Sequence, residues 1–465
     1  MLRLLVAALL LTALSLAATG PVYVVLWFDT EDYIEPSSDN AALRIANDLT
    51  AEGVRATFKV VGEKARVLEQ RGRRDVIEAL SRHTIGYHSN WHSVHPTPAE
   101  YLLHFGYLEG ADEFERRESA GLADVKRIFK QQPVCYGQPG SSWGPQSNLA
   151  LRRMQVPVYL DEGDQVGVND QPFWYDGLLY VFRMGQNQFR AQLNVGPEDP
   201  AAYRRFDEAA ARLTSQGGGV ISIYYHPTEF VTTEFWDGVN FSRGANPGRE
   251  SWIKPKLRTP AESERCYGVL RHFVQHMKAQ PGVRFAGAQD LPRLFADPPA
   301  HALDRKAVAA QLSREIVFGE VQGLMLSPAE MLLALLELKP QFVDGPTARG
   351  TSTYSKPTIP AAAFQRAARD AADFVTRLHR LPNQVFIGAD TLSLADFAAT
   401  LASSMEGGSE FPVVRGRIGY DRYFATDGRK PFNWIIHSEG FDGTPLLELG
   451  RLQGWTLKPA RLSTH

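Results

Sequence analysis

Two histidines, His88 and His92, stand four residues apart in the segment Gly-Tyr-His-Ser-Asn-Trp-His. In a helical turn this spacing would point both imidazoles in the same direction. Two imidazoles and one carboxylate make a facial site for a divalent metal such as Zn, Co or Ni. Histidine pairs also occur on ordinary surfaces, so the pair needs partners before it indicates a metal site.

Candidate partners follow the apolar run 22–28, where Asp29, Glu31 and Asp32 lie within four residues. Carboxylates this close repel one another, which favours a compensating metal or a proton-transfer role over a merely solvated turn. Side chains alternate along a strand, so Glu31 would share a side with Asp29. This favours Glu31 as the third metal ligand, and Asp32 stays open as the alternative.

A third histidine, His226, ends another apolar run and precedes a proline. With an ordinary pKa near 6.5, a histidine in such a place could donate a proton at neutral pH, although a purely structural histidine is the plain alternative. Asp161 and Asp164 follow a further apolar run, and either could orient His226. The spacing does not decide between them, and Asp161 is taken as the candidate.

Short apolar runs alternate with helical stretches from residue 20 to 297, a pattern that predicts parallel strands joined by crossover helices. Helices are expected over 41–52 and after Thr259, where a capping box precedes a first-turn proline. In an α/β domain, parallel strands bring their carboxyl ends to the same side, where active sites lie. The expected strands are 22–28, 56–61, 134–137, 156–160, 178–182, 220–225 and 283–286.

Beyond the turn Asp297-Pro298-Pro299 the alternation gives way to helical periodicity, which predicts a second, mainly α-helical domain over 300–465. Two segments there, starting at Ser327 and Ser393, each place an acid three residues after a serine that opens an apolar helix. This repeat hints at a duplicated helical unit, and a chance match is the alternative. The stretch 342–360 between the two copies is predicted to be a loop.

The first residues place Arg3 before an apolar run, 4–16, and small residues at Ala17 and Ala18, which is the layout of a secretory signal peptide over 1–17. We therefore expect a secreted, periplasmic or cell-envelope protein without a membrane span after cleavage. Among its 465 residues, 50 basic and 52 acidic side chains give a net charge of −2, which disfavours a nucleic-acid partner. Cys135 and Cys266 allow at most one disulfide.

Together and in this order, the motifs around these residues resemble the polysaccharide deacetylases, carbohydrate esterase family 4 with its NodB-like domain. The resemblance covers 20–297 and implies a distorted (β/α) barrel with a metal at the carboxyl ends of its strands. It also implies that Asp29 is the general base and His226 the general acid. The motifs that carry it are Phe28 to Asp32, Ala56 to Gly62, Gly86 to His92 and Tyr225 to Pro227.

Two features depart from that family's pattern. The first motif of the family usually holds an aspartate pair, whereas this chain has Glu31 and Asp32. The third motif of the family usually begins with an arginine, whereas this chain has Gln138 at the matching position. A neutral glutamine would hydrogen-bond the base less strongly than arginine. The segment from Gln138 through Gly140 could still offer backbone N–H groups to an oxyanion. Trp91, Trp143 and Trp236 are candidates for stacking on sugar rings, although tryptophans more often pack in cores.

The resemblance implies a metal-dependent hydrolase that removes N-acetyl groups from a cell-wall or other extracellular polysaccharide, peptidoglycan included. Two alternatives stay open: an amidohydrolase acting on a small non-sugar amide, and a catalytically weak protein that binds glycans or the cell wall. The paired helical segments beyond residue 300 are faintly similar to pseudomurein-binding repeats, which hints at wall attachment.

Overall fold

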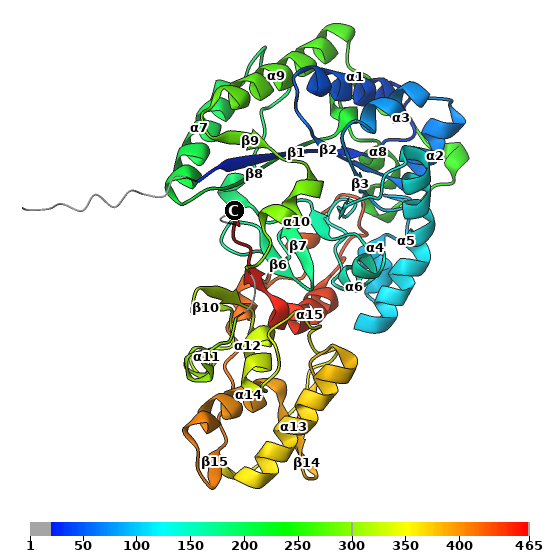
Figure 1. The fold of residues 1–465 in the computed structure, drawn as a ribbon. Coiled ribbons are helices and arrows are strands. Elements are labelled where there is room, and N and C mark those ends of the chain that lie inside the picture. Colours follow the sequence, from blue (N-terminus) through cyan, green and yellow to red (C-terminus); the bar gives the residue numbers. More distant parts are fainter. Residues whose placement is uncertain (1–19, 299–300, 464–465) are drawn as a thin grey trace, which may run out of the picture.

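The computed structural model describes residues 20–298 and 301–463. The predicted signal peptide over 1–17 lies outside the described residues. Figure 1 shows an α/β region built mainly from the first three hundred residues, with a smaller region below it. No helix within the described ranges has the length and apolar character needed to cross a bilayer.

The α/β region is organised around one ten-stranded sheet, in the order β16-β6-β7-β5-β4-β3-β2-β1-β8, with β9 also paired to β1. Every pairing is parallel except the two that β6 makes with β7 and β16. The strands are β1 (Val22–Thr30), β2 (Thr57–Val60), β3 (Thr84–Tyr87), β4 (Cys135–Tyr136), β5 (Val158–Leu160), β6 (Phe173–Tyr175), β7 (Leu178–Val181), β8 (Gly219–Tyr225), β9 (Val283–Phe285) and β16 (Lys458–Pro459).

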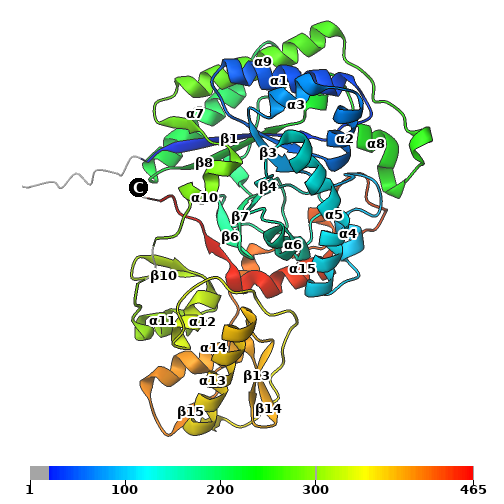
Figure 2. The same cartoon turned by 45° about the vertical axis from the view of Figure 1, so that its right-hand side comes forward.

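Helices connect these strands and cover the sheet (Figures 1 and 2). Most crossovers are single helices or helix pairs, as expected for parallel strands. The helices are α1 (Ser37–Ala51), α2 (Gly62–Gln70), α3 (Arg74–Leu80), α4 (Pro98–Leu102), α5 (Tyr107–Phe129), α6 (Gln146–Arg153), α7 (Pro200–Ser215), α8 (Trp236–Phe241), α9 (Pro260–Ala279) and α10 (Leu291–Leu294).

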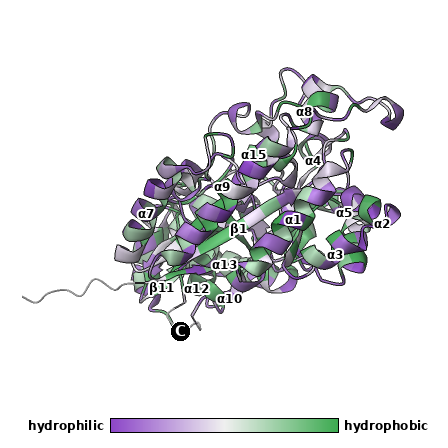
Figure 3. Ribbon diagram, turned by 90° about the horizontal axis from the view of Figure 1, so that it is seen from above, coloured by the Kyte–Doolittle hydropathy of each residue, from purple (hydrophilic) through white to green (hydrophobic). Residues whose placement is uncertain are grey.

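Strand β1 lies at the centre of this region because its sequence is almost continuously apolar and can be buried on both faces. One edge pairs with β8 from Val22 to Phe28, and the other edge pairs with β9 at its start and with β2 at its end. Figure 3 shows this hydrophobic strand between α9 and α1. The strand order leaves no pairing between β16 and β8 among the described residues, so the curled sheet is a distorted, open form of the predicted barrel.

The mainly helical domain predicted for the region beyond residue 300 is not confirmed, since short strands accompany its helices. The region combines helices with three two-stranded sheets: two are β-hairpins that precede the capped helices, and the third pairs residues 358–360 with 410–412. The elements are α11 (Arg305–Leu312), β10 (Gly319–Val321), β11 (Leu324–Leu326), α12 (Pro328–Leu335), β12 (Thr358–Pro360), α13 (Ala361–Leu378), β13 (Gln384–Ile387), β14 (Asp390–Ser393), α14 (Leu394–Ser403), β15 (Glu410–Pro412) and α15 (Thr444–Leu452).

The order helix, hairpin, helix occurs twice in this region, first over α11 to α12 and then over α13 to α14. At the start of each second helix a serine side chain accepts the backbone N–H of an acid three residues on, Ser327 from Glu330 and Ser393 from Asp396. Such caps satisfy N–H groups that a helix start leaves unpaired. The two capping patterns seen in the sequence therefore begin two equivalent helices.

The end of the chain returns to the α/β region. Strand β16 pairs antiparallel with β6, and the Tyr175 hydroxyl donates to the Gly450 carbonyl at 2.8 Å. Figure 2 shows α15 and the last residues against the sheet, between the two regions. Residues beyond 300 thus complete the edge of the main sheet as well as forming the smaller region.

The two cysteines are both buried free thiols, one in β4 and one in α9.

Glu118, on α5, makes the stability of this fold depend on pH. Burial raises the pKa of this carboxyl to about 7, although the Tyr87 hydroxyl donates to it at 2.6 Å. Between the ordinary pKa of 4.5 and 7 the folded state keeps a proton that the unfolded state has lost, so stability falls as pH rises through this window.

Relative to the wild type, Glu118→Gln is therefore expected to gain about 3 kcal/mol of unfolding free energy between pH 4.5 and pH 7.5. Urea unfolding at both pH values measures this difference. Glu113→Gln, on the same helix, is the matched control, because the pKa of Glu113 is lowered to about 2 by Arg116 and the group stays ionised across this window. Equal pH dependence in the two variants would contradict the prediction.

Candidate active site

The residues singled out in the sequence meet at the carboxyl ends of the parallel strands. Asp29 lies near the end of β1 and Glu31 just past it, His88 follows β3, Asp161 follows β5, and His226 follows β8. Because parallel strands deliver their carboxyl ends to one side of the sheet, segments that are far apart in the sequence converge there. These side chains are all buried or nearly so.

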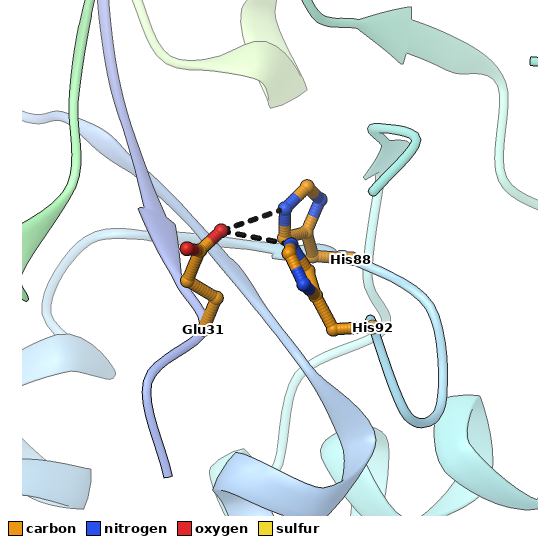
Figure 4. Close-up of side chains that lie close together, drawn as sticks. All are labelled: Glu31, His88 and His92. Atoms are coloured by element: carbon orange, nitrogen blue, oxygen red, sulfur yellow. Dashed lines mark ion pairs between the residues drawn. The ribbon is translucent and has the colours of Figure 1, made fainter. Parts of the chain in front are cut away.

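Three of them form a compact cluster, drawn in Figure 4. The Glu31 Oε2 atom lies 2.8 Å from His92 Nε2 and 3.5 Å from His88 Nε2. The other nitrogen of each ring is engaged elsewhere: His88 Nδ1 contacts the Gly137 carbonyl at 2.9 Å, and His92 Nδ1 contacts the Ser93 hydroxyl at 2.6 Å. Both Nε2 atoms are thereby aimed at one carboxylate oxygen.

This arrangement fits a divalent metal. One ligand atom from each of Glu31, His88 and His92 lies within 4.8 Å of the others, and all three side chains are buried. Metal-ligating histidines characteristically hold their second nitrogen in a hydrogen bond, as both do here. Burial lowers the pKa of His88, which favours a neutral ring, whereas the Glu31 carboxylate raises the pKa of His92 against the effect of burial; a bound metal would require both rings to be neutral. Two imidazoles and a carboxylate suit Zn, Co or Ni.

Glu31 is the carboxylate that lies in the cluster with His88 and His92, and the alternative, Asp32, lies outside it. Asp32 Oδ1 accepts the backbone N–H groups of Ile34 and Glu35, each at 3.0 Å, and Oδ2 accepts the Thr228 hydroxyl at 2.8 Å. The strand alternation that favoured Glu31 persists past the end of β1, which turns Asp32 away from Asp29. Asp32 therefore shapes the turn that leads into α1.

The histidine pair is positioned by a loop and not by the helical turn expected from its spacing. Ser89 and His92 both have positive φ, 62° and 55°, which is uncommon for residues other than glycine. The loop is held by the start of α2, whose Gly62 and Glu63 N–H groups donate to the carbonyls of Ser89 and Asn90 at 2.9 Å. Backbone strain of this kind persists where the surroundings hold it, often at functional sites.

Asp29 has a cationic partner that the sequence did not reveal. Lys59 Nζ, on β2, lies 2.9 Å from Asp29 Oδ1 and 2.7 Å from Asp161 Oδ2, and its side chain is fully buried. It also lies over the ring of Trp27, at 4.1 Å from the centroid. Against the effect of burial, Asp161 and Asp29 raise the pKa of Lys59, so the amine stays charged. Asp29, His88 and Asp161 are also close enough for a metal, but the ammonium already bridges the two carboxylates there.

Two glycines make room for this lysine. Strand pairing places Lys59 beside Asp29 on one side and beside Gly86 on the other. A Cβ atom at Gly86 would lie 2.9 Å from Lys59 Cγ, and one at Gly137 would lie 1.9 Å from Lys59 Nζ. The ammonium thus occupies the space that a side chain at residue 137 would fill. Gly86 and Gly137 were the only indication in the sequence that a lysine from the neighbouring strand could extend into this space.

Gln138 is therefore not the partner of Asp29, contrary to the expectation from the third motif. Its Oε1 accepts the Tyr159 hydroxyl at 3.0 Å, and its Nε2 donates to the Gly140 carbonyl at 3.2 Å. Gln138 and Gly140 do line the cavity beside the metal cluster. The Ser142 N–H is already bonded to the Pro139 carbonyl, so an oxyanion donor from this loop would come from the residues before Ser142.

His226 is oriented by Glu229 and not by Asp161. His226 Nδ1 contacts Glu229 Oε1 at 2.6 Å, and Arg190 in turn donates to Glu229 at 2.7 Å. Burial would lower the pKa of His226, but the carboxylates of Glu31 and Glu229 raise it to about 9. The orienting acid comes from the short turn after His226, because Lys59 already engages Asp161. The free nitrogen, Nε2, lies 3.7 Å from Asp29 Oδ2.

The three histidines of the site open onto one cavity of about 810 Å³ together with Asp29, Glu31 and Asp161, and Tyr224, Phe235 and residues near 430–435 also line it. The tryptophans expected to stack on sugars are placed otherwise. Trp143 is fully buried in the core, and Trp236 is buried with its Nε1 3.3 Å from Glu31 Oε1, where it supports a ligand. Trp91 is 43% exposed but lies against Arg66, outside the cavity lining.

No family model and no curated protein matches this chain. Among solved structures it is similar to a protein described as a polysaccharide deacetylase from Mycobacterium smegmatis, at 15% identity and a TM-score of 0.37, covering 59% of this chain and 90% of that one. It is similar to a CE4 family pseudoenzyme from Bacillus anthracis at 12% identity and a TM-score of 0.30, covering 59% and 66%. It is similar to a 4-alpha-glucanotransferase from Thermococcus litoralis at 11% identity and a TM-score of 0.39, covering 60% and 41%. At these values the likeness assigns neither a family nor an activity, so function is argued from the site.

Proposed function

We propose that this protein is a metal-dependent hydrolase that removes N-acetyl groups from a cell-wall or other extracellular polysaccharide. The observation that carries the proposal is the convergence of a Glu31, His88 and His92 cluster with Asp29 and His226 at the floor of one cavity. A metal site, a carboxylate and a protonated histidine are sufficient parts for one route of amide hydrolysis, with a metal-activated water, a general base and a general acid.

Asp29 is suited to act as general base. Its Oδ1 is held by Lys59 at 2.9 Å, which leaves Oδ2 directed towards His226 and the cavity. Asp29 would take a proton from a water molecule as that water adds to the acyl carbon. A divalent metal at Glu31, His88 and His92 would, when bound, acidify the water and polarise the acyl carbonyl.

His226 is suited to act as general acid. Its Nδ1 is engaged by Glu229, so the proton to be delivered lies on Nε2, which faces the cavity floor. When the C–N bond breaks, His226 would protonate the departing nitrogen, and the products are a carboxylate and a free amine. Backbone N–H groups between Gln138 and Ser141 could stabilise the oxyanion.

The substrate class follows from the cavity and from the start of the chain. A cavity of about 810 Å³ with polar and aromatic walls suits part of a glycan chain. The apolar run at 4–16 is the ground for proposing a secreted or periplasmic protein, where peptidoglycan and other wall polysaccharides are found. The repeated helix-hairpin-helix units beyond residue 300 are proposed to serve wall attachment.

The test is acetate release from N-acetylglucosamine oligomers and from peptidoglycan by protein loaded with Zn or Co. We expect Asp29→Asn to lower kcat by about 10³-fold, because general-base catalysis contributes on this order. The variant should still bind one equivalent of metal, since Asp29 lies outside the ligand cluster. If metal binds but no substrate loses acetate, and Asp29→Asn changes nothing, the proposal is wrong.

A further inference from the structure

A segment from the far end of the chain lies across the candidate active site. Residues 430–438, called here the 430–438 segment, contribute five of the cavity-lining residues: Lys430, Pro431, Asn433, Trp434 and Ile435. The segment is tied down on both sides. Gln165 donates to the Pro431 carbonyl at 2.6 Å, and the Arg243 and Gly244 N–H groups donate to the carbonyls of Ile435 and Ile436 at 2.9 and 2.8 Å.

Trp434 is the most firmly held side chain of this segment. Its Nε1 donates to Asp237 Oδ2 at 2.9 Å, and its backbone N–H donates to the Ser141 hydroxyl at 2.9 Å. The loop after β4 is shaped to receive the ring: Gly140 has a φ of +52°, and a Cβ atom there would lie 2.1 Å from Trp434 Cδ2. A half-buried indole fixed in this way presents a rigid apolar surface to the cavity.

Trp434 and Phe235 flank different histidines. Trp434 stands at 88° to the His92 ring, with 5.4 Å between ring centroids. Phe235 stands at 86° to the His226 ring, at 4.9 Å. One apolar wall therefore adjoins a metal ligand, and the other adjoins the proposed proton donor.

We propose that Trp434 is the wall that receives the acyl group of the substrate and limits its length to that of a short chain such as acetyl. The inference rests on the proposed function. His226 must lie next to the departing nitrogen, so the amine side of the substrate is on the side of Phe235. The acyl side extends away from His226, towards His92 and Trp434, where an apolar surface suits a methyl group and a rigid ring blocks a longer chain.

The test compares Trp434→Ala and Trp434→Phe with Trp174→Phe in the metal-loaded full-length protein. Trp174 is half-buried on β6, next to the edge strand β16, and lines a different cavity, so it controls for the loss of an indole. The quantity measured is kcat/KM for N-acetyl, N-propionyl and N-butyryl glucosamine oligomers. We expect Trp434→Ala to raise the ratio of butyryl to acetyl activity by at least about 10-fold, because each methylene in an apolar pocket is worth about 10-fold or more. Trp174→Phe should leave the ratio unchanged.

A second measurement does not depend on catalysis. The visible absorption of the Co-loaded protein is titrated with acetate and with butyrate, whose carboxylates can approach the metal as products would. Trp434→Ala should gain affinity for butyrate relative to acetate. If Trp434→Ala gains this affinity although no variant hydrolyses any amide, the proposed function is wrong. The assignment of Trp434 as the wall that limits acyl length is then still supported.

If the acyl selectivity and the carboxylate ranking are both unchanged in Trp434→Ala, while activity falls equally for all substrates, Trp434 only supports the fold and the inference is overturned. Thermal unfolding is recorded for each variant. Should Trp434→Ala fail to fold, Trp434→Phe decides the question, because it keeps an aromatic ring but frees the space of the second ring. It should shift both ratios in the same direction by a few fold, and an unshifted Trp434→Phe would overturn the inference.

Discussion

Lys59→Met is expected to lower kcat for amide hydrolysis by at least about 10²-fold while one equivalent of metal still binds. The reason is that Lys59 is the cation that holds Asp29, through a contact of 2.9 Å to Oδ1 between two buried side chains. Without the ammonium group of Lys59, Asp29 is no longer held in place, and no positive charge separates it from the Asp161 carboxylate. The acid limb of the kcat/KM profile should also move to higher pH, which a merely structural lysine would not cause.

The same substitution should be costly for the fold. Removing one partner of a buried ion pair leaves charge uncompensated, and such losses amount to about 3–5 kcal/mol of unfolding free energy. Burial raises the pKa of Asp161 to about 7, so this carboxyl is the one that can take up a proton when the lysine is gone. Lys59→Met combined with Asp161→Asn should therefore recover part of the stability without recovering activity.

Lys64 provides the matched control. It is buried to the same degree and pairs with Asp39 at 2.6 Å, whereas Lys59 pairs with Asp29 and Asp161. Lys64→Met should lose a similar amount of stability in urea and keep kcat in the folded fraction. If Lys59→Met and Lys64→Met lose stability alike and neither loses kcat or changes the pH profile, Lys59 has no role in supporting the base.

The central strands and their polar ends could be predicted from the sequence because both follow from local patterns. An apolar run such as 22–28 must be buried, and the polar residues after it, Asp29 and Glu31, then fall at the carboxyl edge. Since parallel strands share this edge, His88 and His226 could be expected there as well. The register of side chains along β1 also favoured Glu31, the carboxylate that the structure places beside His88 and His92.

The parts that the sequence did not reveal depend on contacts between distant segments. Lys59 sits within an ordinary apolar run, and only the register of β2 against β1 and β3 places it beside Asp29 and Gly86. The choice between Asp161 and Glu229 as partner of His226 depended on which carboxylate the lysine had already taken. The loop geometry at His92 and the return of the 430–438 segment have no periodic signal at all.

Lys59 bears directly on whether the site is active. The suspicion of a degenerate site rested on a glutamine where a cation was expected, and that glutamine turns out to bond Tyr159 instead. The cation is present but is delivered from a neighbouring strand, through space that Gly86 and Gly137 leave open. Asp29 therefore has a cationic partner in Lys59, even though the third motif has a glutamine in place of the arginine.

The position of Glu31 in the cluster with His88 and His92 leads to a prediction about metal affinity. Glu31→Gln is expected to weaken metal binding by at least about 10²-fold and to abolish metal-dependent activity, because a neutral amide replaces the only carboxylate in the cluster. The variant should otherwise fold normally, since glutamine has the same size. Zn or Co affinity measured by competition with a chromophoric chelator gives the result without reference to turnover.

Asp32→Asn is the matched control, one residue away and equally buried. Its carboxylate serves the Ile34 and Glu35 N–H groups and the Thr228 hydroxyl, so the substitution should cost about 1 kcal/mol of stability and leave metal affinity within a few fold of the wild type. Equal loss of metal in both variants would show that Asp32 also reaches the metal. If only Asp32→Asn loses metal affinity, Asp32 and not Glu31 is the ligand. The inference that side chains keep alternating past the end of β1 would then be wrong.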